Sequence, residues 1–218
     1  MPLVITLAHQ KGGVGKSTLA TNLRSIFASS DYKAGLVDVD PQGSLTRLLT
    51  IQAGKKPDDL IALQPYTNDE EKKKAYDTLI VEMAPYDIVI VDTPPYLSAD
   101  LTTVLGFTHL VLVPCKTSPL DFLAIGDTLD LIREARVDYP GLVCAIVLSM
   151  TITGTDFTRK FRDDLSTKLE FPVLKTEVGN RIAYMRSLDT ADSIAGEDNR
   201  KARDEMRSLA DELISLLK

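Results

Sequence analysis

Apolar residues gather in short, nearly continuous runs along the chain, and longer stretches with helical spacing lie between them. Runs rich in β-branched residues are typical of strands buried on both faces, as in a parallel sheet covered by helices. We expect five such strands, at residues 3–8, 35–39, 87–91, 109–113 and 142–148. The helical spacing predicts helices at residues 16–29, 69–83, 119–135, 155–169 and 199–217.

This alternation of strands and helices predicts an α/β doubly wound fold, with a mostly parallel sheet flanked by helices and right-handed crossovers. Residues 54–68 show neither pattern, so we expect a surface excursion there. No repeat, low-complexity tract or linker interrupts the chain, and we therefore expect one domain over residues 1–218.

Composition adds the setting in which the protein works. Hydrophobic residues make up 44% and charged residues 26% of the chain, which is ordinary for a soluble globular protein. Cys115 and Cys144 each lie within an apolar run, so we expect reduced, buried thiols and neither a zinc nor an iron–sulfur site. No apolar run is long enough to cross a membrane or to form a signal peptide, and we expect a cytoplasmic protein.

The charge is unevenly distributed, although the net charge of −6 does not suggest a nucleic-acid-binding protein. Residues 159–186 hold seven Lys/Arg against four Asp/Glu, and a local basic face is what binds phosphate backbones. A solvated helix face explains this small excess equally well. The candidate DNA contacts are Arg159, Lys160, Arg181, Arg186, Arg200, Lys201 and Arg203.

A glycine-rich segment, HQKGGVGKST, follows the first predicted strand and opens the first predicted helix. Its glycines let several backbone N–H groups point at one anion, and the helix start adds a positive dipole end. We expect Lys16 to reach the β- and γ-phosphates, Ser17 to bind Mg²⁺ and Thr18 to hold the α-phosphate. The residues expected to bind ATP are Lys11, Gly12, Gly13, Val14, Gly15, Lys16, Ser17 and Thr18.

This loop departs from the usual GxxxxGK[ST] pattern, because Gln10 stands at the first glycine and Lys11 follows it. The form KGGVGKST resembles the deviant Walker A motif of the ParA/MinD family of ATPases. The resemblance implies that Lys11 crosses a dimer interface to the partner's nucleotide, while Lys16 acts in its own chain. A cation at the γ-phosphate stabilises charge that develops during phosphoryl transfer, so both lysines are catalytic candidates. An exposed loop lysine is the alternative for Lys11.

Two aspartates follow the second predicted strand in the sequence DVDPQG. Taken alone, Asp38 and Asp40 would more often be a helix cap or part of a turn. By resemblance to the family's second motif, Asp40 positions the attacking water and Asp38 lies near Mg²⁺. The corresponding switch I segment is Asp40, Pro41, Gln42 and Gly43.

The sequence IVIVDTPP places Asp92 at the end of another predicted strand, as in a Walker B motif that holds a Mg²⁺-bound water. The following Thr93 and Pro94 resemble the family's switch II. An aspartate that caps the next helix is the alternative. The metal candidates are therefore Ser17, Asp38 and Asp92.

Later landmarks of the family are present in looser form. The sequence VPCKTSPLD resembles a loop in which a proline and an acid, here Asp121, face the dimer interface. Ser149 and Met150 stand where relatives often carry an asparagine against adenine. The sequence VGNRIAYMRS places Arg181 on a recurrent arginine of the family.

Several branches of the family are less consistent with this chain. Iron proteins of nitrogenase and Mrp-type scaffolds need cluster-binding cysteines. MinD-type proteins end in a basic membrane helix, whereas the last predicted helix here is acidic and its apolar stripe is expected to pack on the core. Because the first strand starts at Leu3, we also expect no N-terminal helix-turn-helix domain. A short ParA-type partition or positioning ATPase fits best.

The resemblance implies a Mg²⁺-dependent ATPase with weak basal activity, whose ATP-bound homodimer binds DNA non-specifically on the nucleoid. A ParB-like or adaptor protein would stimulate hydrolysis and reset the dimer. The alternatives are a MinD-like membrane-positioning ATPase, an ATP-dependent small-molecule enzyme of the same fold, and a protein that holds ATP without hydrolysing it. Lys11, together with the two aspartate motifs, favours the switch.

Overall fold

Seven parallel strands form one sheet in the computed structural model, which describes residues 1–96, 99–189, 194 and 200–218. The strand order is β3-β2-β4-β1-β5-β6-β7: β2 and β3 extend one side, β4 is inserted between β2 and β1, and β5 to β7 extend the other side. This reversal beside β1 leaves a crevice at the carboxyl ends of the strands, where doubly wound folds bind ligands. The strands are β1 (Leu3–Leu7), β2 (Ala34–Asp38), β3 (Leu60–Ala62), β4 (Ile88–Asp92), β5 (Leu110–Lys116), β6 (Val143–Thr151) and β7 (Val173–Gly179).

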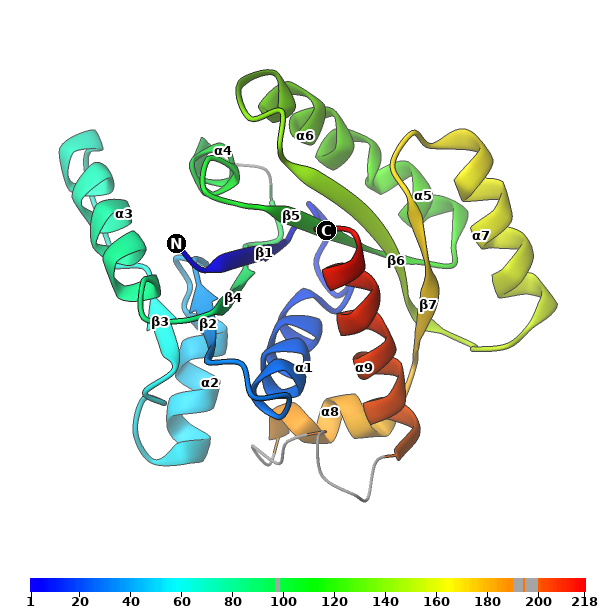
Figure 1. The fold of residues 1–218 in the computed structure, drawn as a ribbon, viewed down its shortest axis with the longest axis horizontal. Coiled ribbons are helices and arrows are strands. Elements are labelled where there is room, and N and C mark those ends of the chain that lie inside the picture. Colours follow the sequence, from blue (N-terminus) through cyan, green and yellow to red (C-terminus); the bar gives the residue numbers. More distant parts are fainter. Residues whose placement is uncertain (97–98, 190–193, 195–199) are drawn as a thin grey trace.

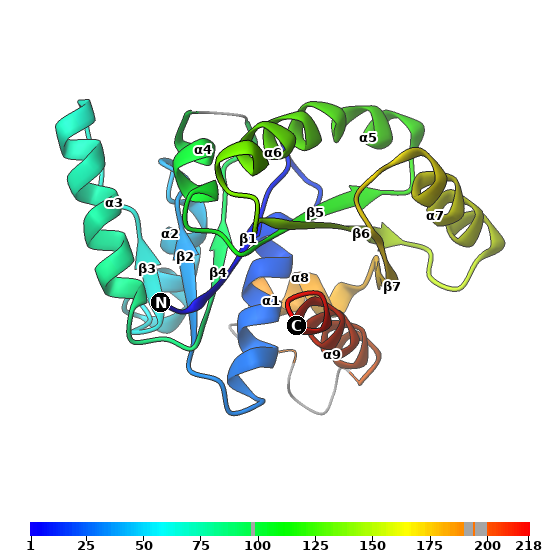
Figure 2. The same ribbon diagram turned by 45° about the horizontal axis from the view of Figure 1, so that its top comes forward.

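Helices cover both faces of the sheet, which confirms the predicted α/β architecture (Figures 1 and 2). One face carries α1 (Lys16–Ala28), α2 (Ser44–Ala53), α8 (Ile182–Asp189) and α9 (Arg200–Ser215). The other face carries α3 (Asp69–Met83), α4 (Ala99–Leu105), α5 (Pro119–Ala124), α6 (Gly126–Asp138) and α7 (Asp156–Lys168).

The central strands are apolar at nearly every position because each of their faces is buried. In β5, Leu110 and Leu112 pack toward α1 and α9, while Val111 and Val113 pack toward α6. All four side chains are 0% exposed. Successive side chains point to opposite faces of the sheet, but both faces are covered by helices and both sets of side chains are apolar. These strands therefore appear in the sequence as continuous apolar runs.

The expectation of a surface excursion at residues 54–68 is wrong, because this segment contains the edge strand β3. Leu60 and Ile61 are buried and lie beside Leu36 and Val37 of β2. Three residues are too few to produce a recognisable period. Within the described residues, β7, α2, α4 and α8 were also not among the elements that the periodicity predicted.

The single helix predicted at residues 119–135 is divided at Ile125 into α5 and α6, and α6 continues to Asp138. The Ser118 side chain caps α5 by accepting a hydrogen bond from the Asp121 backbone N–H. Ile125 itself is 0% exposed, so the junction between the two helices is packed into the core. Both helices matter for the site, because Asp121 of α5 and Asp127 of α6 contact the loop after β1.

The apolar stripe of the last helix packs on the core, as expected. Met206, Leu209 and Leu213 are 0% exposed and join the cluster that includes residues of α1. The Glu212 carboxylate of α9 accepts hydrogen bonds from the backbone N–H groups of Lys175 and Thr176 at 2.7 and 3.0 Å. In the described part of the chain, no helix is both long and apolar enough to span a bilayer.

Candidate nucleotide-binding site

The three predicted motifs meet at the carboxyl ends of β1, β2 and β4. Asp92 at the end of β4 is in register with Asp38 of β2 on one side and with Leu7 of β1 on the other. The glycine-rich loop leaves β1 directly after Leu7, between the last strand residue and α1. Residues that are more than eighty positions apart in the sequence therefore surround one small region, as the order of the motifs predicted.

The loop has the backbone conformation that an anion site requires. Gly13 and Gly15 have φ angles of 71° and 94°, in the left-handed region that favours glycine. Gly15 is the N-cap of α1 and no side chain caps this helix end. The N–H groups of the first turn of α1 are consequently left for a phosphate.

Lys16 lies inside the curl of the loop. It is 7% exposed, and its Nζ donates to the carbonyl oxygens of His9 at 2.9 Å and Lys11 at 3.3 Å. Burial lowers the pKa of its amine, and the nearby carboxylates of Asp92 and Asp40 oppose that shift. An amine held only by carbonyl oxygens is well suited to transfer its hydrogen bonds to phosphate oxygens.

Lys11 takes a different position, on the outside of the loop. Its side chain is 45% exposed, and its Nζ lies 2.8 Å from Oδ1 of Asp121 in α5. Burial acts to raise the pKa of Asp121, but hydrogen bonds from Lys11 and Ser118 outweigh it, so the pKa lies below its usual value. Asp121 was expected to face a dimer interface; in this structure its carboxylate binds the lysine that was expected to cross that interface.

Two residues of the loop make contacts that sequence reasoning missed. Gln10, at the position of the usual first glycine, donates through Nε2 to the Ala124 carbonyl at 2.8 Å and to Asp127 Oδ2 at 2.9 Å. His9 accepts a hydrogen bond at Nδ1 from the Lys11 backbone N–H at 2.8 Å. The partners of Gln10 lie more than a hundred residues away in the chain, so no local pattern signals them.

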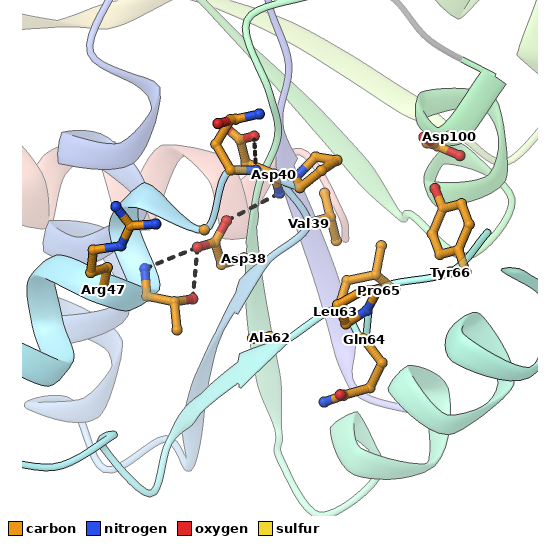
Figure 3. A pocket seen from close by; sticks show the side chains of 14 residues that line it. Asp38, Val39, Asp40, Arg47, Ala62, Leu63, Gln64, Pro65, Tyr66 and Asp100 are labelled. Atoms are coloured by element: carbon orange, nitrogen blue, oxygen red, sulfur yellow. Dashed lines mark hydrogen bonds between the residues drawn. The ribbon is translucent and has the colours of Figure 1, made fainter. Parts of the chain in front are cut away.

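Asp38 at the end of β2 and Asp40 just after it organise the turn that leads into α2 (Figure 3). Asp38 Oδ2 accepts from the backbone N–H and the hydroxyl of Thr46 at 2.9 and 2.7 Å, and its Oδ1 accepts from the Asp40 N–H at 3.1 Å. Asp40 Oδ1 accepts from the Gln42 N–H at 2.9 Å. These are the cap and turn contacts that the alternative interpretation predicted. The roles of Asp38 at Mg²⁺ and Asp40 at the attacking water stay predictions.

A cavity of about 510 Å³ lies beside this turn (Figure 3). Its walls are residues 38–43 with Thr46 and Arg47, the segment 62–66 after β3, and Asp100 at the start of α4. Gly43, with a φ of 57°, stands between the turn and α2. The turn at residues 40–43 therefore borders open space and has a glycine at its hinge, as a moving switch needs.

Among the carboxyl groups of this region, Asp92 has the pKa that is shifted furthest from its usual value. It is 3% exposed, and burial raises its pKa to about 7; the Ser17 hydroxyl and Lys16 act to lower it, and Asp38 acts to raise it. Its Oδ1 has no hydrogen-bond partner among the described residues. A buried carboxylate that lacks a hydrogen-bond partner and lies beside a serine hydroxyl fits a Mg²⁺ ion. Ser17 and Asp92 would hold that ion.

This fit does not need a larger set of protein ligands. Among the described residues no group of three or more His, Cys, Asp or Glu could hold a metal ion. Mg²⁺ keeps several waters and takes phosphate oxygens, so one or two protein ligands suffice. Thr93 of the expected switch II donates its hydroxyl to the Leu7 carbonyl at 2.7 Å, and the next residue, Pro94, is buried.

A second, smaller cavity of about 90 Å³ lies beside Gly15 and Thr18 of the predicted nucleotide loop. Ser149 lines it, but its hydroxyl donates to the Val14 carbonyl at 3.0 Å. Met150 also lines it and has a left-handed φ of 52°. Neither Ser149 nor Met150 offers both the amide donor and the carbonyl acceptor that an asparagine at this position would present to adenine.

The candidate DNA contacts do not form one face. Arg159 and Lys160 belong to α7, whereas Arg200, Lys201 and Arg203 belong to α9 on the other side of the sheet (Figure 2).

Several of the candidates also have acidic neighbours. Arg159 pairs with Asp156 and Arg200 with Asp204, at 2.7 and 3.8 Å. Arg181 donates through Nε to Glu205 Oε2 at 2.9 Å. Five of the candidates are exposed: Arg159, Lys160, Arg186, Arg200 and Lys201.

Together, the parallel sheet, the glycine-rich loop before α1 and the carboxylates at the neighbouring strand ends define a P-loop nucleotide-binding protein. The profile of the CobQ/CobB/MinD/ParA nucleotide-binding domain matches residues 5–194, and the chain belongs to this family. It is 32% identical over 213 residues to the maintenance of carboxysome distribution protein A of Halothiobacillus neapolitanus, across 96% of this chain and 95% of that protein. It is 30% identical to the chromosome-partitioning ATPase Soj of Thermus thermophilus, across 61% and 62% of the two chains.

Solved structures confirm the fold. A putative plasmid partition protein of Borrelia burgdorferi bound to AMPPNP superposes with a TM-score of 0.73 at 19% identity, over 99% of both chains. Cobyrinic acid a,c-diamide synthase of Mycobacterium smegmatis with ADP and magnesium gives a TM-score of 0.73 at 22% identity, over 98% of this chain and 94% of that one. The MinD cell division protein of Aquifex aeolicus gives 0.72 at 17% identity, over 98% and 97%.

Proposed function

We propose that residues 1–218 form one ATPase domain that works as an ATP-dependent dimerisation switch for positioning a cargo. The observation that carries the proposal is the placement of two lysines of one loop. Lys16 is 7% exposed and points into the loop, whereas the side chain of Lys11 is 45% exposed and lies outside it. One cation is available to the chain's own nucleotide, and the other is available to a nucleotide on a second copy.

In the proposed cycle the chain binds Mg·ATP through residues 11–18, with Ser17 and Asp92 on the Mg²⁺ side. Mg²⁺ supplies charge neutralisation at the phosphates when it is bound. Asp40 positions the water that attacks the γ-phosphate. Lys11 of each chain reaches the partner's nucleotide, so basal hydrolysis by a single chain is weak. Hydrolysis removes the γ-phosphate, and the dimer separates.

The relatives support cargo positioning as the purpose of this cycle. One relative that matches nearly the full chain is named for carboxysome distribution, and others are named for chromosome partitioning. We therefore propose a cytoplasmic, nucleoid-associated protein whose ATP-bound dimer binds DNA non-specifically. A ParB-like or adaptor protein on the cargo stimulates hydrolysis. The buried stripe of α9 gives no support to the alternative of membrane positioning.

The first test is nucleotide-dependent assembly. Sedimentation of the purified protein should show a dimer with a slowly hydrolysed ATP analogue and Mg²⁺, and a monomer with ADP. Lys16→Ala should abolish nucleotide binding, whereas Lys11→Ala should bind nucleotide and fail in dimer-dependent hydrolysis. Lys56→Ala is the matched control, because Lys56 is exposed on the loop before β3. A Lys11→Ala protein that dimerises and hydrolyses at the parental rate would remove the basis of the proposal.

The DNA partner needs a separate test, since the basic candidates are spread over the surface. Binding to non-specific duplex DNA is measured with ADP and with the ATP analogue, at two salt concentrations. We expect binding only with the analogue, weakened by salt. Lys160→Glu and Lys201→Glu should each weaken it, and Lys56→Glu should not. Absence of DNA binding in both nucleotide states would leave the ATPase proposal intact and exclude DNA as the surface to which the dimer binds.

A second candidate function is ATP-dependent chemistry on a small molecule. The cavity of about 510 Å³ beside Asp40 favours it, because such a volume accepts a substrate-sized ligand. The similarity of fold to a cobyrinic acid amidation enzyme is consistent with it. An ATPase activity that depends on a small carboxylic acid, and not on DNA or protein, would favour this function over the switch.

A further inference from the structure

His9 links the two lysines of the phosphate loop. It follows β1 and is 1% exposed. Its carbonyl oxygen accepts from Lys16 Nζ at 2.9 Å, and its ring Nδ1 accepts from the Lys11 backbone N–H at 2.8 Å. One buried residue therefore contacts the lysine inside the loop and the lysine outside it.

Lys11 is held at three points. Its backbone N–H donates to the His9 ring, its carbonyl oxygen accepts from Lys16 Nζ at 3.3 Å, and its side-chain Nζ is bound by Asp121. Gly12 and Gly13 follow at once, and Gly13 has a φ of 71°. Glycines place little restraint on the preceding peptide, so the backbone orientation of Lys11 depends on its hydrogen bonds, of which the one its N–H donates to the His9 ring, at 2.8 Å, is shorter than the one its carbonyl accepts from Lys16, at 3.3 Å.

We infer that His9 is a positioning residue for Lys11: its neutral imidazole fixes the direction in which the Lys11 side chain leaves the loop. The inference deepens the proposed function and rests on it, because that direction matters when Lys11 has to reach a second chain. Lys11 binds His9 through its backbone N–H and Asp121 through its Nζ, so it also links the loop to α5. When Asp121 releases Nζ, the hydrogen bond that the Lys11 N–H donates to the His9 ring still holds the backbone of Lys11 in place.

The protonation state of His9 agrees with this geometry. Burial, with contributions from Lys16 and Lys11, lowers the pKa of the ring to about 4, while Asp121 acts to raise it. The ring is therefore neutral at physiological pH, and Nδ1 is free to accept while Nε2 carries the hydrogen.

The test compares two substitutions of His9 in the full-length protein. The side-chain oxygen of His9→Asn is able to accept the same N–H, whereas His9→Leu has a similar size and no acceptor. Hydrogen exchange of the Lys11 amide, measured without nucleotide, should be slow in the parent and in His9→Asn, and fast in His9→Leu. This readout does not depend on ATPase activity.

The second readout is ATPase rate against protein concentration and ATP concentration. For His9→Leu we expect the dimer-dependent kcat to fall about tenfold, the factor that loss of one directed hydrogen bond gives. Its KM for ATP should stay within about twofold of the parent, because the His9 carbonyl and Lys16 are unchanged. His9→Asn should retain about half or more of the parental kcat. In a Lys11→Ala background, His9→Leu should cause no further loss.

The outcomes separate the two ideas. A parent that binds no nucleotide and forms no ATP-dependent dimer would end the proposed function. A parent that dimerises, with His9→Leu at the parental kcat, would overturn the role of His9 alone. An equal loss from His9→Leu with and without Lys11 would also overturn it, since His9 would then act by another route. If His9→Leu is unfolded by circular dichroism, His9→Ala takes its place in each comparison.

Discussion

Asp92 provides a test of the electrostatics of the site that needs neither nucleotide nor partner. Its carboxyl group is 3% exposed at the end of β4, and burial raises its pKa from 3.8 to about 7. In the unfolded chain the group is ionised above about pH 4. At neutral pH, folding therefore moves the Asp92 carboxylate from water, where it is ionised, into a buried position that disfavours its charge. Asp92→Asn keeps the shape and removes the charge.

The sign follows from proton linkage. Because the pKa is higher in the folded state, the protonated carboxyl group favours folding at low pH, and this contribution is lost as the pH rises toward 7. A shift from 3.8 to about 7 corresponds to at most about 4 kcal/mol. Asp92→Asn should thus match the parent near pH 4 and be more stable by about 2–4 kcal/mol at pH 8.

The assay is urea unfolding of the nucleotide-free protein at pH 4, 5, 6.5 and 8, with Asp77→Asn on the exposed face of α3 as the control. The difference between Asp92→Asn and the parent should grow with pH and level off above about pH 7. The same variant should lose the added stability that Mg·ATP gives the parent. A difference that does not change with pH, or a variant that is less stable at pH 8, would refute the assignment of a raised pKa to Asp92.

Three other outcomes follow from named contacts. Asp40→Ala should bind ATP and accumulate as an ATP-bound dimer, which gel filtration after incubation with ATP would detect; hydrolysis at the parental rate would refute the role of Asp40. Leu209→Ala removes a fully buried side chain of α9 and should cost about 2–5 kcal/mol of unfolding free energy, measured in urea. Cys115 and Cys144 are buried and their thiol pKa values are raised to about 12, so iodoacetamide should label them only after denaturation, as mass spectrometry would show.

The features that could be predicted from sequence are those encoded in adjacent residues. The glycine spacing at residues 12–15 fixes the loop, and the apolar runs that end at Asp38 and Asp92 fix two strand ends. Since the carboxyl ends of parallel strands lie at one edge, these local signals also predicted that the motifs meet. The structure places Asp38 and Asp92 side by side in the β2–β4 register, as that reasoning requires.

The features that could not be predicted depend on contacts between distant segments. The pairing of Lys11 with Asp121 and the contact of Gln10 with Asp127 each join residues more than a hundred positions apart. Edge elements were missed for another reason. In β7 the apolar run is interrupted because its faces differ: Leu174 and Val178 pack in the cluster that includes α9, whereas Lys175 lies on the opposite face and is exposed.

The contacts around Asp38 limit what can move when nucleotide binds. Both of its carboxylate oxygens accept hydrogen bonds, two of them from Thr46 in the first turn of α2, so the end of β2 and the start of α2 are held together. The Asp40 carboxylate accepts from the Gln42 N–H of its own turn, while the Asp40 backbone N–H donates to Asp38. The Asp40 side chain therefore belongs to the turn at residues 40–43, between a fixed strand end and a fixed helix. If Asp40 positions the attacking water as proposed, its movement toward the phosphate needs only a rearrangement of this turn about Gly43, and α2 need not shift. Ordering four residues costs little conformational entropy, so binding of nucleotide is sufficient to order this turn.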